Sequence, residues 1–328
     1  MSPALERYVP PEWAPHRACW MAYPHLEDEW PDLMGAQREF DALVTAIAET
    51  ENVELLCQRP PSSLWNTLYV NHHALPYGDV WTRDTAPVFG VGHGRLQAHV
   101  FDFNGWGGKF AMAGDQDVAG AVVRVSGAER VAHPFVLEGG ALEFDGDGTL
   151  LTTRCVGLAN RNGKALSDAE VKARLSAAFA VDTVLVLEGQ LAADHTDGHV
   201  DTLARFVAPG EVVCMRAGPG DPNGAVLLAV EEQLRSFVDA KGRPLRVHTI
   251  PSPGAVAPRG ELVAASYLNY YLANDQIIVP QYGAHHDQEA ASNLAALYPA
   301  RRIRPLSARS LIEGGGAFHC MTQQEPAL

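Results

Sequence analysis

A cysteine near the C-terminus follows a run of glycines, in the segment Glu313-Gly314-Gly315-Gly316-Ala317-Phe318-His319-Cys320. Glycine costs conformational entropy, so such a run is typical of backbone that turns sharply or packs close to a ligand. Far away in the sequence, Gly198-His199-Val200-Asp201 places a histidine and a carboxylate in alternation. On a strand, positions two residues apart share a face. A thiol, a histidine and a carboxylate from distant segments are the components of an enzyme with a cysteine nucleophile.

Both motifs also have a purely structural interpretation. A single thiol is more commonly a buried, unreactive core residue than a nucleophile. A lone histidine is likewise more often a hydrogen-bonded core residue. The glycines before Cys320 favour the catalytic interpretation there, and the flanking glycine and in-phase aspartate favour it for His199.

Two further carboxylates are candidates, each with an equally strong structural alternative. Asp84 closes the segment Trp81-Thr82-Arg83-Asp84, where it either serves chemistry or pairs with the neighbouring arginine. Glu138 precedes Gly139-Gly140, where it either serves chemistry or occupies a turn. If both belong to the site, it holds three carboxylates, one thiol and one histidine.

That combination points to a particular class of substrate. A cysteine protease needs only one carboxylate or amide to orient its histidine. Several carboxylates suit a planar cation, because a guanidinium carries five N–H donors and pairs bidentately with carboxylates. Two carboxylates can hold such a group while a thiolate attacks its central carbon perpendicular to the plane. The residues therefore predict chemistry on a guanidinium.

The composition is that of a globular protein with a sizeable core, since 47% of the 328 residues are hydrophobic and 20% are charged. The formal net charge of −14 disfavours nonspecific binding to nucleic acid or anionic lipid and favours cationic substrates. Residues 1–6 are neither basic nor apolar, so they do not resemble a signal peptide. Because no apolar run approaches about 18 residues, we expect no membrane span and a cytoplasmic location.

The cysteines and histidines give no pattern of a metal or disulfide site. The five cysteines are scattered, at Cys19, Cys57, Cys155, Cys214 and Cys320. An odd number without a CxxC pair argues against a disulfide framework or structural zinc. Cys57 and Cys214 lie in apolar runs and are expected in the core. The adjacent pairs His72-His73 and His285-His286 do not converge well on one ion, so we expect no metal.

The elements that must position these residues form a repeating pattern. Amphipathic helices are expected at 33–48, 115–125, 167–180, 225–238 and 287–297, each followed by a strand-like run at 53–57, 130–134, 183–187, 245–250 and 302–306. Ser167 and Glu170 form a capping box at the start of the third helix, with Leu166 and Val171 as a hydrophobic staple.

The candidate motifs fall at comparable points in the first, second, third and fifth of these units. The fourth unit offers an aromatic strand at 267–272 without an obvious catalytic pair. Polar motifs converging from four units predict an α/β fold with its units around one axis. We therefore expect residues 1–328 to form a single closed domain.

The chain resembles the agmatine deiminases, within the superfamily that modifies guanidino groups. The resemblance begins at Pro10-Pro11-Glu12-Trp13-Ala14-Pro15-His16 and ends at His319-Cys320-Met321-Thr322-Gln323-Gln324-Glu325-Pro326. Between them lie matching motifs at 20–24, 79–84, 103–109, 137–140, 151–153, 160–162, 196–201 and 264–267. The resemblance implies the pentein fold, a five-bladed α/β propeller. Its five ββαβ-type modules surround a pseudo-fivefold axis, with the active site in the central channel.

The chain also departs from the family pattern. It is shorter than typical agmatine deiminases, chiefly between Lys109 and Glu138. Motif residues differ at Ala14, Tyr23, Val80, Thr82, Asp197, Met321 and Glu325. None of these positions carries the core chemistry, so the departures bear on recognition of the far end of the substrate.

The resemblance assigns roles to the candidate residues. Cys320 is implied as the nucleophile and His199 as the general acid and base. Asp84 and Asp201 are implied as guanidinium anchors, and Glu138 orients His199 or helps to hold the substrate. The covalent intermediate is an amidino-cysteine, which water hydrolyses to a ureido product. Thiol and water supply both steps, so no cofactor is expected.

Three further residues are expected at the substrate. Trp81 and Trp106 are aromatic candidates near the catalytic motifs, and Gly316 belongs to the glycine run. Agmatine carries a terminal amine, which carboxylates or aromatic rings bind well. The acidic balance and the aromatic residues, Trp13 included, favour agmatine, whose product would be N-carbamoylputrescine.

Several alternatives remain open for the function. The substrate could be peptidyl-arginine, free arginine or another alkylguanidine, and free arginine would need a cation to meet its α-carboxylate. An amidinotransferase would use an amine in place of water. The protein could also bind a guanidine without catalysing any reaction. The intact thiol, histidine and aspartate disfavour this alternative. The oligomeric state is open, with a homodimer as one possibility.

The carboxylates also create an electrostatic difficulty. Their negative field should raise the pKa of the Cys320 thiol and oppose formation of the thiolate. A cationic substrate or a protonated His199 would have to reverse this effect. We therefore expect a pH dependence whose apparent pKa values belong to the coupled pair.

Overall fold

A computed structural model describes residues 7–59 and 69–328. Within these ranges the strands form five small sheets, each built on the same plan. An antiparallel strand pairs with a second strand, which is followed by a helix and a third strand parallel to the second. The sequence prediction of five ββαβ modules is therefore confirmed.

The parallel pairs contain the middle and last strands of each module. They are β2 (His16–Ala22) with β3 (Asn52–Leu56), β6 (Arg95–Asp102) with β7 (Glu129–Val136), β9 (Thr149–Thr153) with β10 (Thr183–Leu187), β12 (Glu211–Arg216) with β13 (Arg246–Pro251), and β15 (Gln276–Gln281) with β16 (Arg302–Ser307). The antiparallel first strands are β17 (Gln323–Pro326), β5 (Val88–Gly92), β8 (Leu142–Phe144), β11 (Ala204–Ala208) and β14 (Tyr271–Leu272). Two short strands extend the sheets, β1 (Arg7–Tyr8) beside β5 and β4 (Val70–His73) beside β3.

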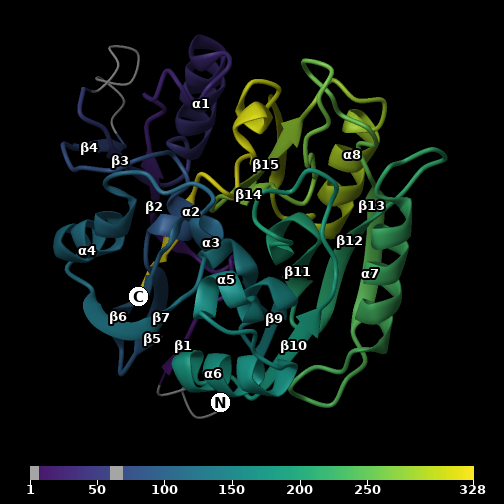
Figure 1. Ribbon diagram of the computed structural model, residues 1–328, viewed down its shortest axis with the longest axis horizontal. Helices are drawn as coiled ribbons and strands as arrows, with labels where there is room; N and C mark the ends of the chain where they lie inside the picture. The colour runs from purple at the N-terminus through teal and green to yellow at the C-terminus, as the bar shows by residue number, and fades with distance from the viewer. Residues whose placement is uncertain (1–6, 60–68) are drawn as a thin grey trace.

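One long helix crosses between the parallel strands of each module. The five are α1 (Leu33–Ile47), α4 (Asp115–Ser126), α6 (Asp168–Phe179), α7 (Gly224–Ser236) and α8 (Asp287–Leu297). They lie around the outside of the molecule, with the strands inside them (Figure 1). All five were predicted to within two residues. No helix in the described part of the chain is long and apolar enough to cross a membrane.

The local signals that predicted the helices are present in the structure. On α1, Phe40, Leu43, Val44 and Ile47 are all fully buried. At the start of α6, Ser167 and Glu170 exchange the two hydrogen bonds of the capping box. These contacts fix where each helix begins and which face it turns to the strands.

The C-terminal strand closes the ring of modules. β17 pairs with β2, so that the last strand of the chain completes the first module. This pairing brings together residues about 300 positions apart, such as Gln323 and Trp20. Cys320 lies three residues before β17, so closure of the ring also positions the candidate nucleophile.

Short helices hold the remaining motifs at the inner ends of the modules. They are α2 (Thr82–Thr85), α3 (Gly105–Gly108), α5 (Ala159–Asn162) and the 3₁₀ turns Gly139–Ala141, Arg154–Gly157, Val200–Thr202 and Leu311–Gly314. The expected strand at His199–Asp201 is wrong, because His199 caps the 3₁₀ turn Val200–Thr202. The aromatic strand expected at 267–272 is reduced to Tyr271–Leu272.

Candidate active site

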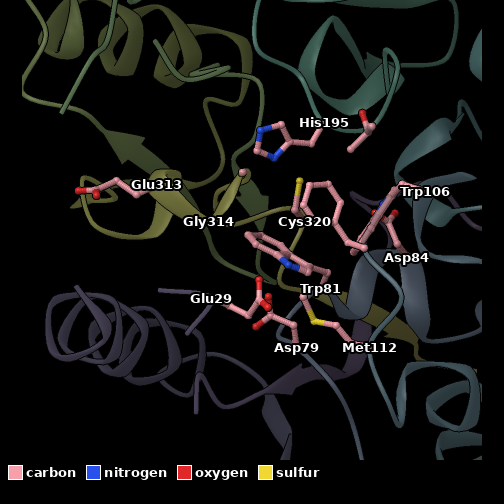
Figure 2. Close-up of a pocket in the computed structure, with 13 residues that line it drawn as sticks. Glu29, Asp79, Trp81, Asp84, Trp106, Met112, His195, Glu313, Gly314 and Cys320 are labelled. Atoms are coloured by element: carbon pink, nitrogen blue, oxygen red, sulfur yellow. The ribbon is translucent and has the colours of Figure 1, made fainter. Parts of the chain in front are cut away.

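A cavity of about 140 Å³ opens above Cys320, between loops of several modules (Figure 2). Aromatic and acidic side chains dominate its wall. The lining residues are Glu29, Asp79, Trp81, Asp84, Trp106, Phe110, Met112, His195, Thr196, Glu313, Gly314, Gly315 and Cys320. Of the residues predicted from sequence, Asp84, Trp81, Trp106 and Cys320 therefore face the cavity directly.

The glycine run allows Cys320 to approach Trp81 closely. Gly315 has a φ of 110°, which favours glycine. A Cβ on Gly316 would lie 2.7 Å from the Trp81 ring and 3.0 Å from Cys320 Sγ. Gly316 does not line the cavity but lies against both residues, so its expected contact with the substrate stays a prediction.

Asp84 lies in α2 and accepts two hydrogen bonds. Trp106 Nε1 donates to its Oδ2 at 2.9 Å and the Gly140 backbone N–H donates to its Oδ1 at 2.8 Å. Arg83 pairs with Glu12 at 3.2 Å rather than with Asp84, so the structural arginine–aspartate pair is not what holds this carboxylate. Burial raises the pKa of Asp84, and the nearby Asp201 carboxylate adds to the effect while His199 opposes it.

His199 is fully buried between two carboxylates. Its Nδ1 lies 3.7 Å from Asp84 Oδ2 and its Nε2 lies 3.9 Å from Glu138 Oε2. Neither ring nitrogen has a hydrogen-bond partner among the described residues. Burial alone would lower the pKa of His199, but the charges of Asp84, Glu138 and Asp201 outweigh it and raise that pKa to about 9.

Glu138 is more than a turn residue. It is fully buried, and Arg161 Nε donates to its Oε1 at 3.1 Å. Burial would raise its pKa, but His199 and Arg161 outweigh burial, so the pKa of Glu138 is lowered. The carboxylate is therefore ionised at neutral pH, facing the His199 ring from the side opposite Asp84.

Asp201 contacts the thiol rather than His199. Its Oδ2 lies 3.5 Å from Cys320 Sγ and 2.7 Å from His319 Nδ1. Its other oxygen, Oδ1, is buried without a hydrogen-bond partner among the described residues. Burial would raise the pKa of Asp201, but the His319 hydrogen bond and the nearby histidines lower it overall. Asp201 therefore does not pair with His199 as expected. It lies beside the candidate nucleophile Cys320 instead.

Sequence reasoning missed two residues of this centre. His319 joins Asp201 to Glu12, whose Oε1 lies 2.6 Å from His319 Nε2. Asn269 contacts Cys320 and Asp201 through its side-chain amide. His319 precedes the cysteine within a quoted motif, but no sequence signal singled out Asn269.

The surroundings of Cys320 disfavour its thiolate in the ligand-free protein. Burial raises the pKa of the thiol well above its ordinary value, and the charges of Asp201 and Asp84 raise it further. A hydrogen bond from Asn269 acts in the opposite direction. The carboxylates therefore oppose ionisation of Cys320, as the sequence predicted. A cation bound between them would lower the pKa of the thiol and favour the thiolate.

One group near the site has the composition of a metal centre. Glu12, Glu143 and His319 place ligand atoms within 4.8 Å of one another. The buried guanidinium of Arg205 pairs with both carboxylates, at 3.0 Å from Glu143. This arginine already supplies the positive charge at the position that an ion would need, so we assign no metal to the group.

The chain is similar to known deiminases in both sequence and structure. The profile of the Porphyromonas-type peptidyl-arginine deiminase family matches residues 8–326. An agmatine deiminase of Stutzerimonas stutzeri is 36% identical, over 98% of this chain and 95% of its own. The solved structure of the Enterococcus faecalis agmatine deiminase has a TM-score of 0.91 at 29% identity, covering 98% of this chain and 96% of the other.

A more distant structure supports the fold alone. DDAH from Pseudomonas aeruginosa is 12% identical, with a TM-score of 0.51 over 94% of this chain and 99% of its own. The ring of five ββαβ modules is the pentein fold that the sequence predicted.

Proposed function

We propose that this chain, a member of the Porphyromonas-type peptidyl-arginine deiminase family, hydrolyses agmatine to N-carbamoylputrescine and ammonia. The observation that carries the proposal is the set of buried groups left unpaired at the thiol. Both ring nitrogens of His199 and Oδ1 of Asp201 lack a hydrogen-bond partner among the described residues. Because buried polar atoms are rarely left unpaired, Asp201 Oδ1 is well explained as an acceptor for a ligand rich in N–H donors, while the N–H groups of the protonated His199 ring are free to donate to a departing group.

The other end of the cavity supports a second positive charge on the substrate. Glu29 and Asp79 line the wall, and Trp81 lies between them and the Cys320 sulfur in the view of Figure 2. Glu313 also lines the cavity and pairs with Arg259. Agmatine carries an ammonium at this end, whereas free arginine would bring an α-carboxylate towards acidic residues. None of the described lining residues is lysine or arginine.

In the first step the bound guanidinium cation favours loss of the Cys320 thiol proton to solvent, and the resulting thiolate attacks the guanidinium carbon to form a C–S bond. Asp84 and Asp201 accept N–H bonds from the guanidinium, which orients its carbon towards the sulfur. His199, whose pKa of about 9 keeps it protonated at neutral pH, donates its proton to the departing nitrogen. The C–N bond then breaks, ammonia leaves and an S-alkylthiouronium remains on the enzyme.

In the second step water replaces the sulfur. His199, now neutral, takes a proton from water, and the oxygen adds to the thiouronium carbon. As the added hydroxyl loses its remaining proton to solvent, the C–S bond breaks, the thiolate of Cys320 is restored and the neutral ureido product departs. Glu138 and Asp84 face the two nitrogens of His199 and stabilise each return to its charged form.

The function is tested by measuring ammonia release from agmatine, free arginine, a blocked peptidyl-arginine and 4-guanidinobutyrate. We expect agmatine to have the highest kcat/KM, because it alone brings an ammonium without a neighbouring carboxylate to Glu29 and Asp79. Glu29→Gln should raise the KM for agmatine and leave kcat little changed. A preference for 4-guanidinobutyrate or arginine would contradict agmatine as the substrate, and no ammonia from any of the four would contradict the deiminase assignment.

A methyl group at Gly140 is expected to disable the site. An added Cβ would lie 2.6 Å from His199 Nδ1 and 2.9 Å from Asp84 Oδ1. Because it would force these catalytic groups apart, Gly140→Ala should lower kcat by roughly 100-fold or more. The measurement is steady-state ammonia release, with Gly120→Ala in α4 as a control, because an added Cβ there would meet only Arg124 Nη1, at 3.6 Å. A Gly140→Ala enzyme with full activity would contradict the proposed placement of His199.

A further inference from the structure

Trp30 lies directly behind one wall of the catalytic cavity without lining it. The side chain is buried and belongs to the segment just before α1. Its ring stacks on that of Trp81, with the ring centroids 5.8 Å apart and the ring planes at 24°. Its Nε1 donates a hydrogen bond to Asp79 Oδ1 at 3.2 Å. Trp30 thus contacts two residues that line the cavity.

A third lining residue, Gly314, packs against the same ring from another part of the chain. A Cβ added at Gly314 would lie 2.6 Å from the Trp30 ring. Gly314 ends the 3₁₀ turn Leu311–Gly314, whereas Trp81 directly precedes α2. Because a close-packed ring cannot shift without leaving a void or making a clash, Trp30 fixes the position of this wall.

The hydrogen bond from Trp30 also acts on the charge of Asp79. Burial raises the pKa of this carboxyl, and the charge of Glu29 adds to the effect. Hydrogen bonds from the Val80 backbone and from the Trp30 and Trp81 side chains oppose it. The two indole groups therefore orient Asp79 and favour the ionised form that binds an ammonium group.

The two ends of the proposed substrate site meet at Trp81. This ring lies between the Cys320 sulfur and the acidic residues at the other end of the cavity (Figure 2). The guanidinium carbon must stay at the sulfur for the reaction to occur. The number of methylenes in the spacer therefore decides where the ammonium falls. With Trp81 and Asp79 held in place, one spacer length fits best.

We propose that Trp30 is a positioning residue that selects the length of the substrate, by holding Trp81 and Asp79 where they suit the four-methylene spacer of agmatine. Trp30 does not line the cavity, so it acts through these two residues. This inference rests on the proposed function and deepens it, because it gives a reason for the rejection of shorter and longer guanidinoalkylamines.

The test compares 3-guanidinopropylamine, agmatine and 5-guanidinopentylamine as substrates for ammonia release. Trp30→Phe keeps an aromatic ring against Trp81 and loses the donor to Asp79. Trp30→Leu loses both and leaves a void behind Trp81. The readout is the ratio of kcat/KM between agmatine and each of the other two amines. A general loss of folded enzyme lowers all three values together and leaves these ratios unchanged.

Trp20→Phe is the matched control for the loss of a buried indole. Trp20 is buried, its Nε1 donates to Glu325 Oε2 at 2.9 Å, and its ring stacks on that of His73. Neither Glu325 nor His73 lines the catalytic cavity. The control therefore removes the same kind of hydrogen bond and the same volume, at a place where we expect no effect on the ratios.

We expect the wild-type protein to prefer agmatine over each of the other amines by roughly 10- to 200-fold, the discrimination that one methylene gives in a fitted pocket. Trp30→Leu should lower the preference over 5-guanidinopentylamine by roughly 10-fold, because Trp81 can move into the void. Trp30→Phe should lower it by about threefold, through the loss of one hydrogen bond.

Ratios that stay at the wild-type values in the Trp30 variants, or that change as much in Trp20→Phe, would overturn the proposal. If Trp30→Leu does not fold, Trp30→Phe still decides. A wild-type protein that releases ammonia from none of the three amines would contradict the proposed function, and this inference with it. An active protein whose ratios do not respond to Trp30 would contradict this inference alone.

Discussion

Replacement of Cys320 by serine is expected to abolish the hydrolysis of agmatine, with kcat for ammonia release reduced by roughly 10⁴-fold or more. Serine has nearly the same size, so the cavity and its carboxylates should persist. Its hydroxyl is far harder to ionise than a thiol, and Asp84 and Asp201 oppose an anion at this position. Agmatine should still bind, which isothermal titration calorimetry can measure alongside the ammonia assay.

The covalent intermediate provides a direct check on the same variant. Rapid mixing of the wild-type enzyme with agmatine should give a protein mass raised by agmatine less ammonia, located on Cys320. Cys320→Ser should show no such species. Cys214→Ala is the matched control, because that thiol is buried in β12 and does not line the cavity. Ammonia release by Cys320→Ser at a rate near that of the wild type would refute nucleophilic catalysis by this residue.

The parts of the fold that could be predicted are those set by local sequence. The capping box at Ser167 and the apolar face of α1 fix helices through contacts within a few residues, and both are present as expected. The glycine run could also be interpreted, because Gly315 needs its positive φ and Gly316 has no room for a side chain. Features of this kind can be predicted from a few neighbouring residues, without knowledge of contacts elsewhere in the chain.

The parts that could not be predicted depend on contacts between modules. The expected strand at His199–Asp201 was wrong because alternation over three residues does not distinguish a strand from a 3₁₀ turn. In that turn the two side chains meet different partners, His199 near Asp84 and Asp201 near Cys320. The partner of each side chain is decided by how the modules close into a ring. The spacing of the residues in the sequence does not decide it.

Asn269 shows the same limit more sharply. It belongs to the fourth module, which offered no candidate, and it meets Cys320 across 51 positions of sequence. An asparagine in an aromatic segment carries no sign of that partner. The catalytic roles, the cytoplasmic location and a homodimer stay predictions, whereas the family and the pentein fold are established by full-length similarity.

His199→Asn is expected to lower kcat by roughly 10²- to 10⁴-fold, because the proposal makes this ring both the acid of the first step and the base of the second. The carboxylates of Asp84 and Glu138 should remain in place around a smaller neutral side chain. If His199 acts as the acid, the variant should form little covalent adduct with agmatine in rapid-mixing mass spectrometry. An adduct that forms at the normal rate and then accumulates would instead confine His199 to the hydrolytic step and contradict its role as the acid.

The acid role also depends on the charge of the ring before substrate arrives. Because the pKa of His199 is raised to about 9, the free enzyme should hold its proton through neutral pH and lose it only as the pH rises through that value. NMR of the histidine ring signals can follow this titration, with His199→Asn assigning the signal. His248→Asn is a matched control, since that ring pairs with Glu211 on the neighbouring strand β12 and does not line the cavity. A His199 signal that titrates near 6.5 would mean that the surrounding carboxylates do not hold the proton, and the first step would then need another acid.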